Sequence, residues 1–144
     1  MWKPRGFGRY HALERKHVIG LKVVLILGFV VLAASDGGNV ILTEKDQGGR
    51  VGVAKGGSLY VRLEASPGTG YGWEIAKNDS RILKLIGKPT FEKSENSQPG
   101  GPETEVFHFE GRSTGTTTLE LHYRRPWEKD VPPAKTFHVE IEVH

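Results

Sequence analysis

The chain has 144 residues, enough for one domain with a buried core and too few for two. It contains no cysteine, which excludes disulfides, a cysteine nucleophile and thiolate metal sites. Its formal net charge is +3, with 20 Lys and Arg against 17 Asp and Glu, so the location of the basic residues decides whether a nucleic-acid partner is expected.

The first 35 residues differ from the rest of the chain. Basic residues precede the run VIGLKVVLILGFVVLAAS, which ends in small residues. This order is typical of a secretory signal peptide, with cleavage expected after Ser35 or Ala34. The uninterrupted apolar part, residues 23–34, is short beside the about 20 residues of a spanning helix, and an uncleaved membrane anchor is the alternative. We therefore expect an exported protein, periplasmic or secreted, that contacts a membrane only if this segment is retained.

The positive charge belongs to this leader. Six of the Lys and Arg residues and one acidic residue lie in it. The expected mature domain, residues 36–144, then carries 14 basic and 16 acidic residues, a net charge of −2. A nucleic-acid partner is therefore not expected, because it would require a basic face on the folded part.

Alternating apolar and polar residues predict strands through most of residues 36–144. In the clearest case Phe137, Val139, Ile141 and Val143 point one way and polar residues the other. No long helical period follows the leader. About seven to eight short strands predict an all-β fold, an antiparallel β-sandwich. The expected strands are 39–44, 51–53, 58–64, 72–76, 82–91, 105–110, 118–123 and 136–143, and the polar segment 92–105 is expected to be a long loop.

The segment SPGTGYGW, residues 66–73, places a glycine at every second position. A phosphate-binding loop would need a helix after it, whereas a strand is expected here, so a loop between two strands is the better interpretation. Pro67 fixes one φ angle, and the glycines allow backbone conformations or close approaches that a side chain would prevent. Trp73 is expected to pack in the core.

A second unusual segment is RRPWEKDVPP, residues 124–133, between two expected strands. Trp127 has little local core in which to be buried. Its ring either folds back on its own domain or acts as an interface anchor, a role in which Trp and Arg are common. The sequence leaves both interpretations open.

Catalytic and metal sites are not expected. His108, His122 and His138 all fall on the polar phase of their strands, where ordinary surface histidines are a better interpretation than a metal site. No G-x-S-x-G motif is present and the acidic residues are scattered. We expect neither an enzyme nor a cofactor.

Taken together, SPGTGYGW, the Gly-rich SQPGGP and RRPW resemble the chagasin family, inhibitors of papain-like cysteine peptidases. The resemblance extends from about residue 40 to 143. Family members have an Asn-Pro-Thr-Thr-Gly-aromatic loop, a Gly-rich middle loop and an Arg-Pro-Trp loop, in this order. Ser66 and Gly68 replace the Asn and the first Thr of the first motif. The matching residues, which the resemblance implies bind the peptidase together with Gly68, are Pro67, Thr69, Gly70, Tyr71, Gly100, Gly101, Arg125, Pro126 and Trp127.

The resemblance implies an immunoglobulin-like sandwich whose loops 66–72, 96–102 and 124–130 wedge across the catalytic cleft of a papain-like cysteine peptidase. Inhibition would be reversible and non-covalent, by a monomer. The family's first Thr contacts the peptidase near its catalytic centre, so Gly68 is expected to alter affinity or selectivity. Ser66 is expected to cap nearby N–H groups as Asn does. Arg125 either contacts the peptidase or braces its own loop.

The alternative function is an exported binding module for a carbohydrate or a surface protein. In that case Tyr71 and Trp127 would serve as the stacking rings.

Overall fold

The structure is a computed structural model that describes residues 38–144, which form nine strands and two short 3₁₀ helices. The predicted signal peptide, residues 1–35, lies outside the described residues. Within the described part, no helix is long and apolar enough to cross a bilayer. The elements are β1 (Val40–Leu42), η1 (Glu44–Asp46), β2 (Arg50–Val53), β3 (Ser58–Ala65), η2 (Pro67–Thr69), β4 (Gly72–Lys77), β5 (Leu83–Leu85), β6 (Thr90–Lys93), β7 (Glu103–Gly111), β8 (Gly115–Arg124) and β9 (Lys135–Val143).

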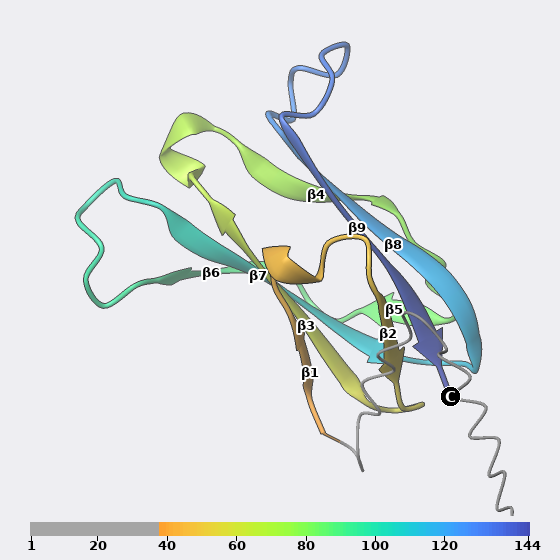
Figure 1. Cartoon of the computed structure of the whole chain (residues 1–144). Coiled ribbons are helices and arrows are strands. Elements are labelled where there is room, and N and C mark those ends of the chain that lie inside the picture. The colour runs from red at the N-terminus through yellow and green to blue at the C-terminus, as the bar shows by residue number, and fades with distance from the viewer. Residues whose placement is uncertain (1–37) are drawn as a thin grey trace, which may run out of the picture.

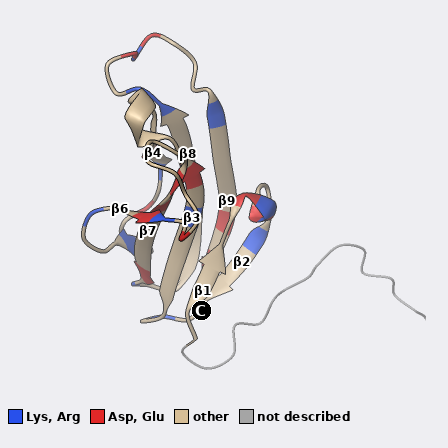
Figure 2. Cartoon of the chain, turned by 90° about the vertical axis from the view of Figure 1, so that its left-hand side faces the viewer, with Lys and Arg blue, Asp and Glu red and all other residues tan. Residues whose placement is uncertain are grey.

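The strands form two sheets packed face to face (Figure 1). One has the order β1-β3-β7-β5, with β6 also paired to β7, and the other has the order β2-β9-β8-β4. The predicted all-β, immunoglobulin-like sandwich is confirmed. Basic and acidic residues are interspersed over the sandwich (Figure 2).

The structure adds two features that the strand pattern did not predict. β1 pairs parallel with β3, and β2 pairs parallel with β9, so both sheets are mixed rather than wholly antiparallel. The chain reaches both partners because η1 carries it from one sheet to the other between two very short strands. In addition, the expected strand 82–91 is two strands, β5 and β6, separated by a segment that contains Pro89, which has no N–H for a sheet ladder.

The core lies between the sheets and follows the alternation read from the sequence. Phe107, Leu121 and Ile141 are at most 2% exposed. Trp73 is also buried, as predicted, and its indole N–H donates to the carbonyl oxygen of Glu64 at 2.9 Å. The polar atom of this large ring is thereby satisfied inside the sandwich.

The three histidines do not form a common cluster. His108 lies on β7 of one sheet, whereas His122 and His138 lie on β8 and β9 of the other. Each has its own partner: Ser58 for His108, Glu120 for His122 and Gln47 for His138. The described residues contain no group of three or more His, Cys, Asp or Glu arranged to hold a metal ion.

Two phenylalanines on neighbouring strands test this description of the core. Phe107 on β7 is 2% exposed, whereas Phe91 on β6 is 46% exposed. We expect Phe107→Ala to lower the free energy of unfolding by about 3–5 kcal/mol, because it leaves a cavity between the sheets. We expect Phe91→Ala to lower it by less than about 1 kcal/mol. Urea unfolding measures both, and similar losses would contradict the assignment of the core.

Candidate functional site

Three loops leave the same end of the sandwich. We call residues 66–71 the first loop, 94–102 the middle loop and 125–134 the third loop. Ala65 is paired with Glu103, so the first loop begins beside the end of the middle loop. Gly72 is paired with Arg124, so the first loop ends beside the start of the third. In Figure 1 the first loop lies at the upper left, the middle loop at the left and the third loop at the top, all away from the C-terminus.

The first loop is a tight turn rather than an extended segment. Its residues Pro67–Thr69 form η2, in which the N–H of Thr69 donates to the carbonyl oxygen of Ser66 at 2.9 Å. Gly70 ends the turn with φ +79°, a left-handed conformation that favours glycine. The Ser66 side chain makes no capping hydrogen bond, contrary to the expectation from the sequence. Instead, the Thr69 hydroxyl donates to the Ser66 carbonyl oxygen at 2.5 Å and closes the turn.

Side chains from two other strands hold the ends of the first loop. The N–H of Ser66 donates to the hydroxyl oxygen of Tyr123 on β8 at 2.9 Å. The N–H of Trp73, just after the loop, donates to Oε2 of Glu105 on β7 at 2.9 Å. Both ends are therefore fixed to the body of the sandwich, one through each sheet.

The motifs do not include Glu105 and Tyr123, but the strand pattern contains a signal for both. Glu105 shares the inward phase of Phe107 and Phe109, and Tyr123 shares that of Leu121. A carboxylate in the apolar phase of a predicted strand needs a buried hydrogen-bond donor. In this structure the donor is the backbone at the end of the first loop.

Arg125 joins the third loop to the first. Its Nε donates to the carbonyl oxygen of Thr69 at 3.1 Å, and its guanidinium carbon lies 4.5 Å from the centroid of the Tyr71 ring. Its Nη1 lies 3.3 Å from a carboxylate oxygen of Glu128. The sequence left open whether Arg125 contacts the peptidase or braces its own loop, and in the free chain it braces the loops.

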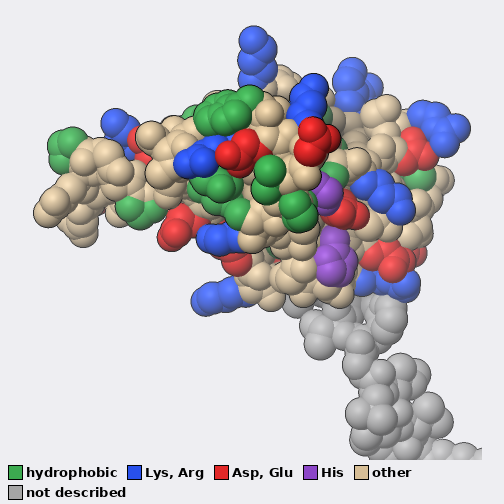
Figure 3. Space-filling model, turned by 90° about the horizontal axis from the view of Figure 1, so that it is seen from above, with side chains coloured by type: hydrophobic (Ala, Val, Ile, Leu, Met, Phe, Trp, Pro, Cys, Tyr) green, Lys and Arg blue, Asp and Glu red, His purple; other side chains and the backbone are tan. Residues whose placement is uncertain are grey.

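Trp127 is 68% exposed, yet its position is defined by the first loop. A Cβ atom at Gly70 would lie only 2.3 Å from Cη2 of the Trp127 ring, so the ring rests directly on the bare backbone of Gly70. The ring thus folds back on its own domain along one edge, which contacts the first loop, while most of it faces solvent, and its role as an interface anchor stays a prediction. Seen from above, hydrophobic side chains gather among charged ones on this face (Figure 3).

Gly68 and Gly70 differ in why they lack a side chain. Gly70 has a positive φ and a ring against it, and both require glycine. A Cβ atom at Gly68 would meet nothing within 4 Å, and its φ is not in the left-handed region. Nothing in the part of the chain that the structure describes therefore explains the glycine at the tip of the first loop.

The middle loop is built separately from the other two. The N–H of Gly101 donates to the carbonyl oxygen of Gln98, and the N–H of Ser97 donates to that of Ser94, both at 2.9 Å. Gly100 and Gly101 line a hollow of about 150 Å³ formed by the middle loop and its flanking residues. The structure thus brings together Pro67, Thr69, Gly70, Tyr71, Arg125, Pro126 and Trp127. It places Gly100 and Gly101 at the same end of the sandwich, in a loop closed by its own hydrogen bonds.

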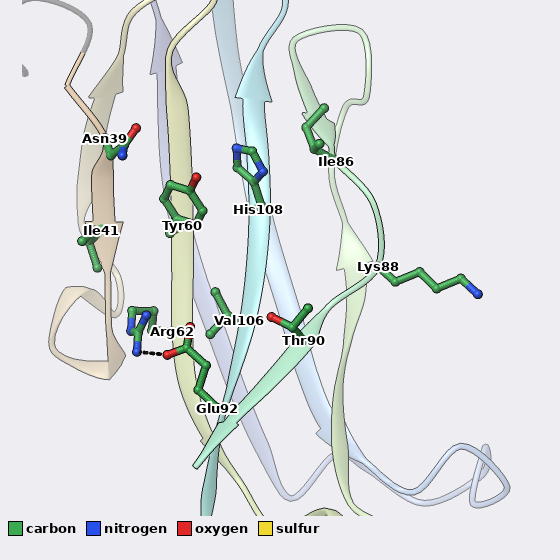
Figure 4. A pocket seen from close by; sticks show the side chains of 10 residues that line it. All are labelled: Asn39, Ile41, Tyr60, Arg62, Ile86, Lys88, Thr90, Glu92, Val106 and His108. Atoms are coloured by element: carbon green, nitrogen blue, oxygen red, sulfur yellow. Dashed lines mark hydrogen bonds and ion pairs between the residues drawn. The ribbon is translucent and has the colours of Figure 1, made fainter. Parts of the chain in front are cut away.

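The candidate site protrudes, whereas a wider hollow lies elsewhere. A depression of about 420 Å³ occupies the outer face of the five-stranded sheet (Figure 4). Tyr60 and His108 stack there with their centroids 4.5 Å apart, and an ion pair joins Arg62 to Glu92. None of the site residues expected from the sequence lines this depression. The projection of the loops from the sandwich and the exposure of Trp127 favour insertion of the loops into a partner's cleft.

Comparison with known proteins bears on this geometry. Residues 52–141 match the model of the chagasin family peptidase inhibitor I42. Amoebiasin-2 of Entamoeba histolytica is 28% identical over 96 residues, which cover 67% of this chain and 78% of that protein.

Two solved structures share the fold. The crystal structure of the cysteine protease inhibitor EhICP2 from Entamoeba histolytica has a TM-score of 0.64 and 25% identity, covering 74% of this chain and 95% of that one. The solution structure of amebosin has a TM-score of 0.58 and 26% identity, covering 75% and 100%. The family is one of inhibitors and not of enzymes, as expected. With its family model matched over most of the described sandwich, the chain belongs to the chagasin family of peptidase inhibitors.

Proposed function

We propose that this protein inhibits papain-like cysteine peptidases reversibly by placing its three loops across the catalytic cleft. Its membership of a peptidase inhibitor family supports this function, as does its similarity to EhICP2, which is described as a cysteine protease inhibitor. The structural observation that carries the proposal is the contact of the first and third loops, which presents a bare turn at Gly68 beside the exposed ring of Trp127.

The shape of the first loop explains how it can enter a cleft without being cut. A substrate lies extended, so that a carbonyl group faces the catalytic thiolate. The first loop is a 3₁₀ turn closed by the Thr69 hydroxyl, and Gly70 turns the chain away. It can therefore cover the thiolate by bulk and hydrogen bonds without offering a carbonyl in the extended pose. Because the chain has no cysteine, it cannot exchange thiols with its target.

The bracing of the loops favours tight binding. Loops that are ordered only on binding lose affinity to conformational entropy, and here Arg125, Tyr123 and Glu105 already hold the first loop in place. Trp127 supplies an exposed aromatic anchor, and such anchors carry much of the energy of interfaces that bury about 1,600 Å². Gly100 and Gly101 would meet the opposite rim of the cleft.

The carbohydrate-binding alternative is less well supported by the geometry. It needs exposed faces on Tyr71 and Trp127. The Tyr71 ring is stacked with Tyr123, with their centroids 5.3 Å apart, and also lies beneath the Arg125 guanidinium. Of the two rings, only that of Trp127 is then largely exposed.

Export is the second part of the proposal. The leader at residues 1–35 would direct the chain to the periplasm or the medium, where the cysteine-free sandwich acts as a monomer. A monomer keeps the loop-bearing end free for the peptidase.

The first prediction concerns the aromatic anchor. We expect Trp127→Ala to raise the inhibition constant for papain about 30-fold, the equivalent of about 2 kcal/mol. Val131→Ala in the same loop, where the side chain is 51% exposed, is the matched control and should leave the constant within about twofold. Titrations of papain activity measure both. An unchanged constant for Trp127→Ala would remove that residue from the site.

The second prediction separates the two glycines of the first loop. We expect Gly70→Ala to lower the free energy of unfolding by about 1–2 kcal/mol and to weaken inhibition, because it strains φ and displaces Trp127. Gly68→Ala should leave stability within about 0.5 kcal/mol, since its Cβ meets open space. Combining Gly70→Ala with Trp127→Ala should weaken inhibition by less than the product of the two single effects. Full additivity in this cycle would show that the contact has no role in binding.

A further inference from the structure

A groove of about 320 Å³ runs beside the first loop and reaches across to β6. Pro67 and Tyr71 of the first loop, Phe91 of β6 and Pro126 of the third loop form its walls, and Glu105 of β7 lines it. The groove therefore opens on the face that carries the candidate site. Phe91 and Glu105 are not among the residues implied by the family motifs.

Strand pairing explains why a carboxylate lies in this groove. Glu105 is paired with Leu63 on one side and with Phe91 on the other, and paired residues of antiparallel strands point to the same face. Leu63 is 0% exposed, so Glu105 also points between the sheets and is 5% exposed. β4 is the edge strand of its sheet. The backbone N–H of Trp73, on β4, donates a hydrogen bond to the Glu105 carboxylate.

The ionised carboxylate is costly in this position. Burial raises the pKa of Glu105, and the hydrogen bond from the Trp73 N–H offsets the rise only in part. A folded-state pKa above the unfolded value means that the protonated form stabilises the fold at acidic pH. This contribution is lost as the pH rises through the folded-state pKa, so the charge at neutral pH lowers stability.

The other groups that face Glu105 do not compensate its charge. β3 and β6 contribute Leu63 and Phe91, which are uncharged, and the first loop contributes the phenol of Tyr71. Glu74 from β4 and Arg124 from β8 also line the groove, but they pair with each other at 3.4 Å. The groove therefore has apolar walls at Tyr71, Phe91 and Pro126, and its Glu105 carboxylate has no ion-pair partner among the described residues.

We propose that this groove receives a basic side chain, lysine or arginine, from the rim of the bound peptidase. Such a side chain combines an apolar stem, which would lie against Phe91 and Pro126, with a cationic head that would pair with Glu105. Binding would supply the counter-charge that the free protein lacks. The groove thus selects among papain-like peptidases for those with a basic residue at the facing rim. This inference rests on the proposed function.

A small cation tests the groove without any peptidase. We expect n-butylammonium chloride at neutral pH to shift the backbone amide resonance of Trp73 saturably, and n-butanol at the same concentration and ionic strength to leave it in place. Glu105→Gln should abolish the response, because the amide keeps an oxygen for the Trp73 N–H but carries no charge. An equal response in this variant, or no response in the unaltered protein, would overturn the proposal.

Inhibition of papain provides the second test. We expect Glu105→Gln to raise the inhibition constant at least tenfold at pH 7. The difference between the two proteins should shrink toward pH 4, where the carboxyl of the unaltered protein takes up a proton. Glu110→Gln, the same change at the far end of β7, is the matched control and should have no effect. Equal inhibition by the Glu105→Gln variant and the unaltered protein would overturn the proposal.

Two further controls separate the possible failures. If the Glu105→Gln variant does not fold, Phe91→Ala takes its place. This substitution removes a half-exposed side chain from the wall of the groove and should weaken both the n-butylammonium response and the inhibition of papain. If the unaltered protein fails to inhibit papain or any related peptidase, the proposed function is wrong. The n-butylammonium titration then still decides whether the groove binds a cation.

Discussion

Trp73 ties the two sheets together at the end of the sandwich that carries the loops. Its indole N–H bonds β3 through the Glu64 carbonyl, and its backbone N–H bonds β7 through Glu105. Its ring packs 5.1 Å from that of Tyr123 on β8, whose hydroxyl in turn holds the N–H of Ser66. Strands of both sheets thus meet at one buried side chain, and the first and third loops start from this fixed base.

The site built on this base is a pair of loops that stabilise each other. The Arg125 guanidinium reaches the backbone of Thr69 and the face of Tyr71, and the Trp127 ring lies on Gly70. The first loop is therefore rigid because of a side chain from the third, and the exposed ring of the third is positioned by the first. This mutual support suits an inhibitor, since a loop that stays in its turn does not relax into the extended form that a peptidase cuts.

Much of the fold could be predicted because one face of each long strand is buried. The alternation in residues 136–143 appears as β9, and that of 58–64 as β3. The parallel pairing of β1 with β3 and of β2 with β9 could not be predicted, because strands of three or four residues carry no local sign of their partner.

The loop residues of the site could be named from their motifs, but their contacts could not. The sequence left the role of Arg125 open because its partner, Thr69, lies 56 positions away along the chain. For the same reason, nothing in the first loop alone indicated that the Trp127 ring requires a glycine at position 70. Glu105 is different. Its place in the alternating pattern predicts that its side chain is buried, and a buried carboxylate requires a hydrogen-bond donor.

The independence of the middle loop has a consequence for how this scaffold can change. Its turns close on themselves through Gln98 and Ser94, so its length and composition can vary while the paired loops keep their geometry. Substitutions or insertions there would alter the fit to one side of a target without disturbing the part that blocks catalysis. With the loop roles proposed above, the scaffold would separate the inhibitory element from an exchangeable recognition module, an arrangement that suits both evolutionary drift toward new peptidases and laboratory redirection of the inhibitor.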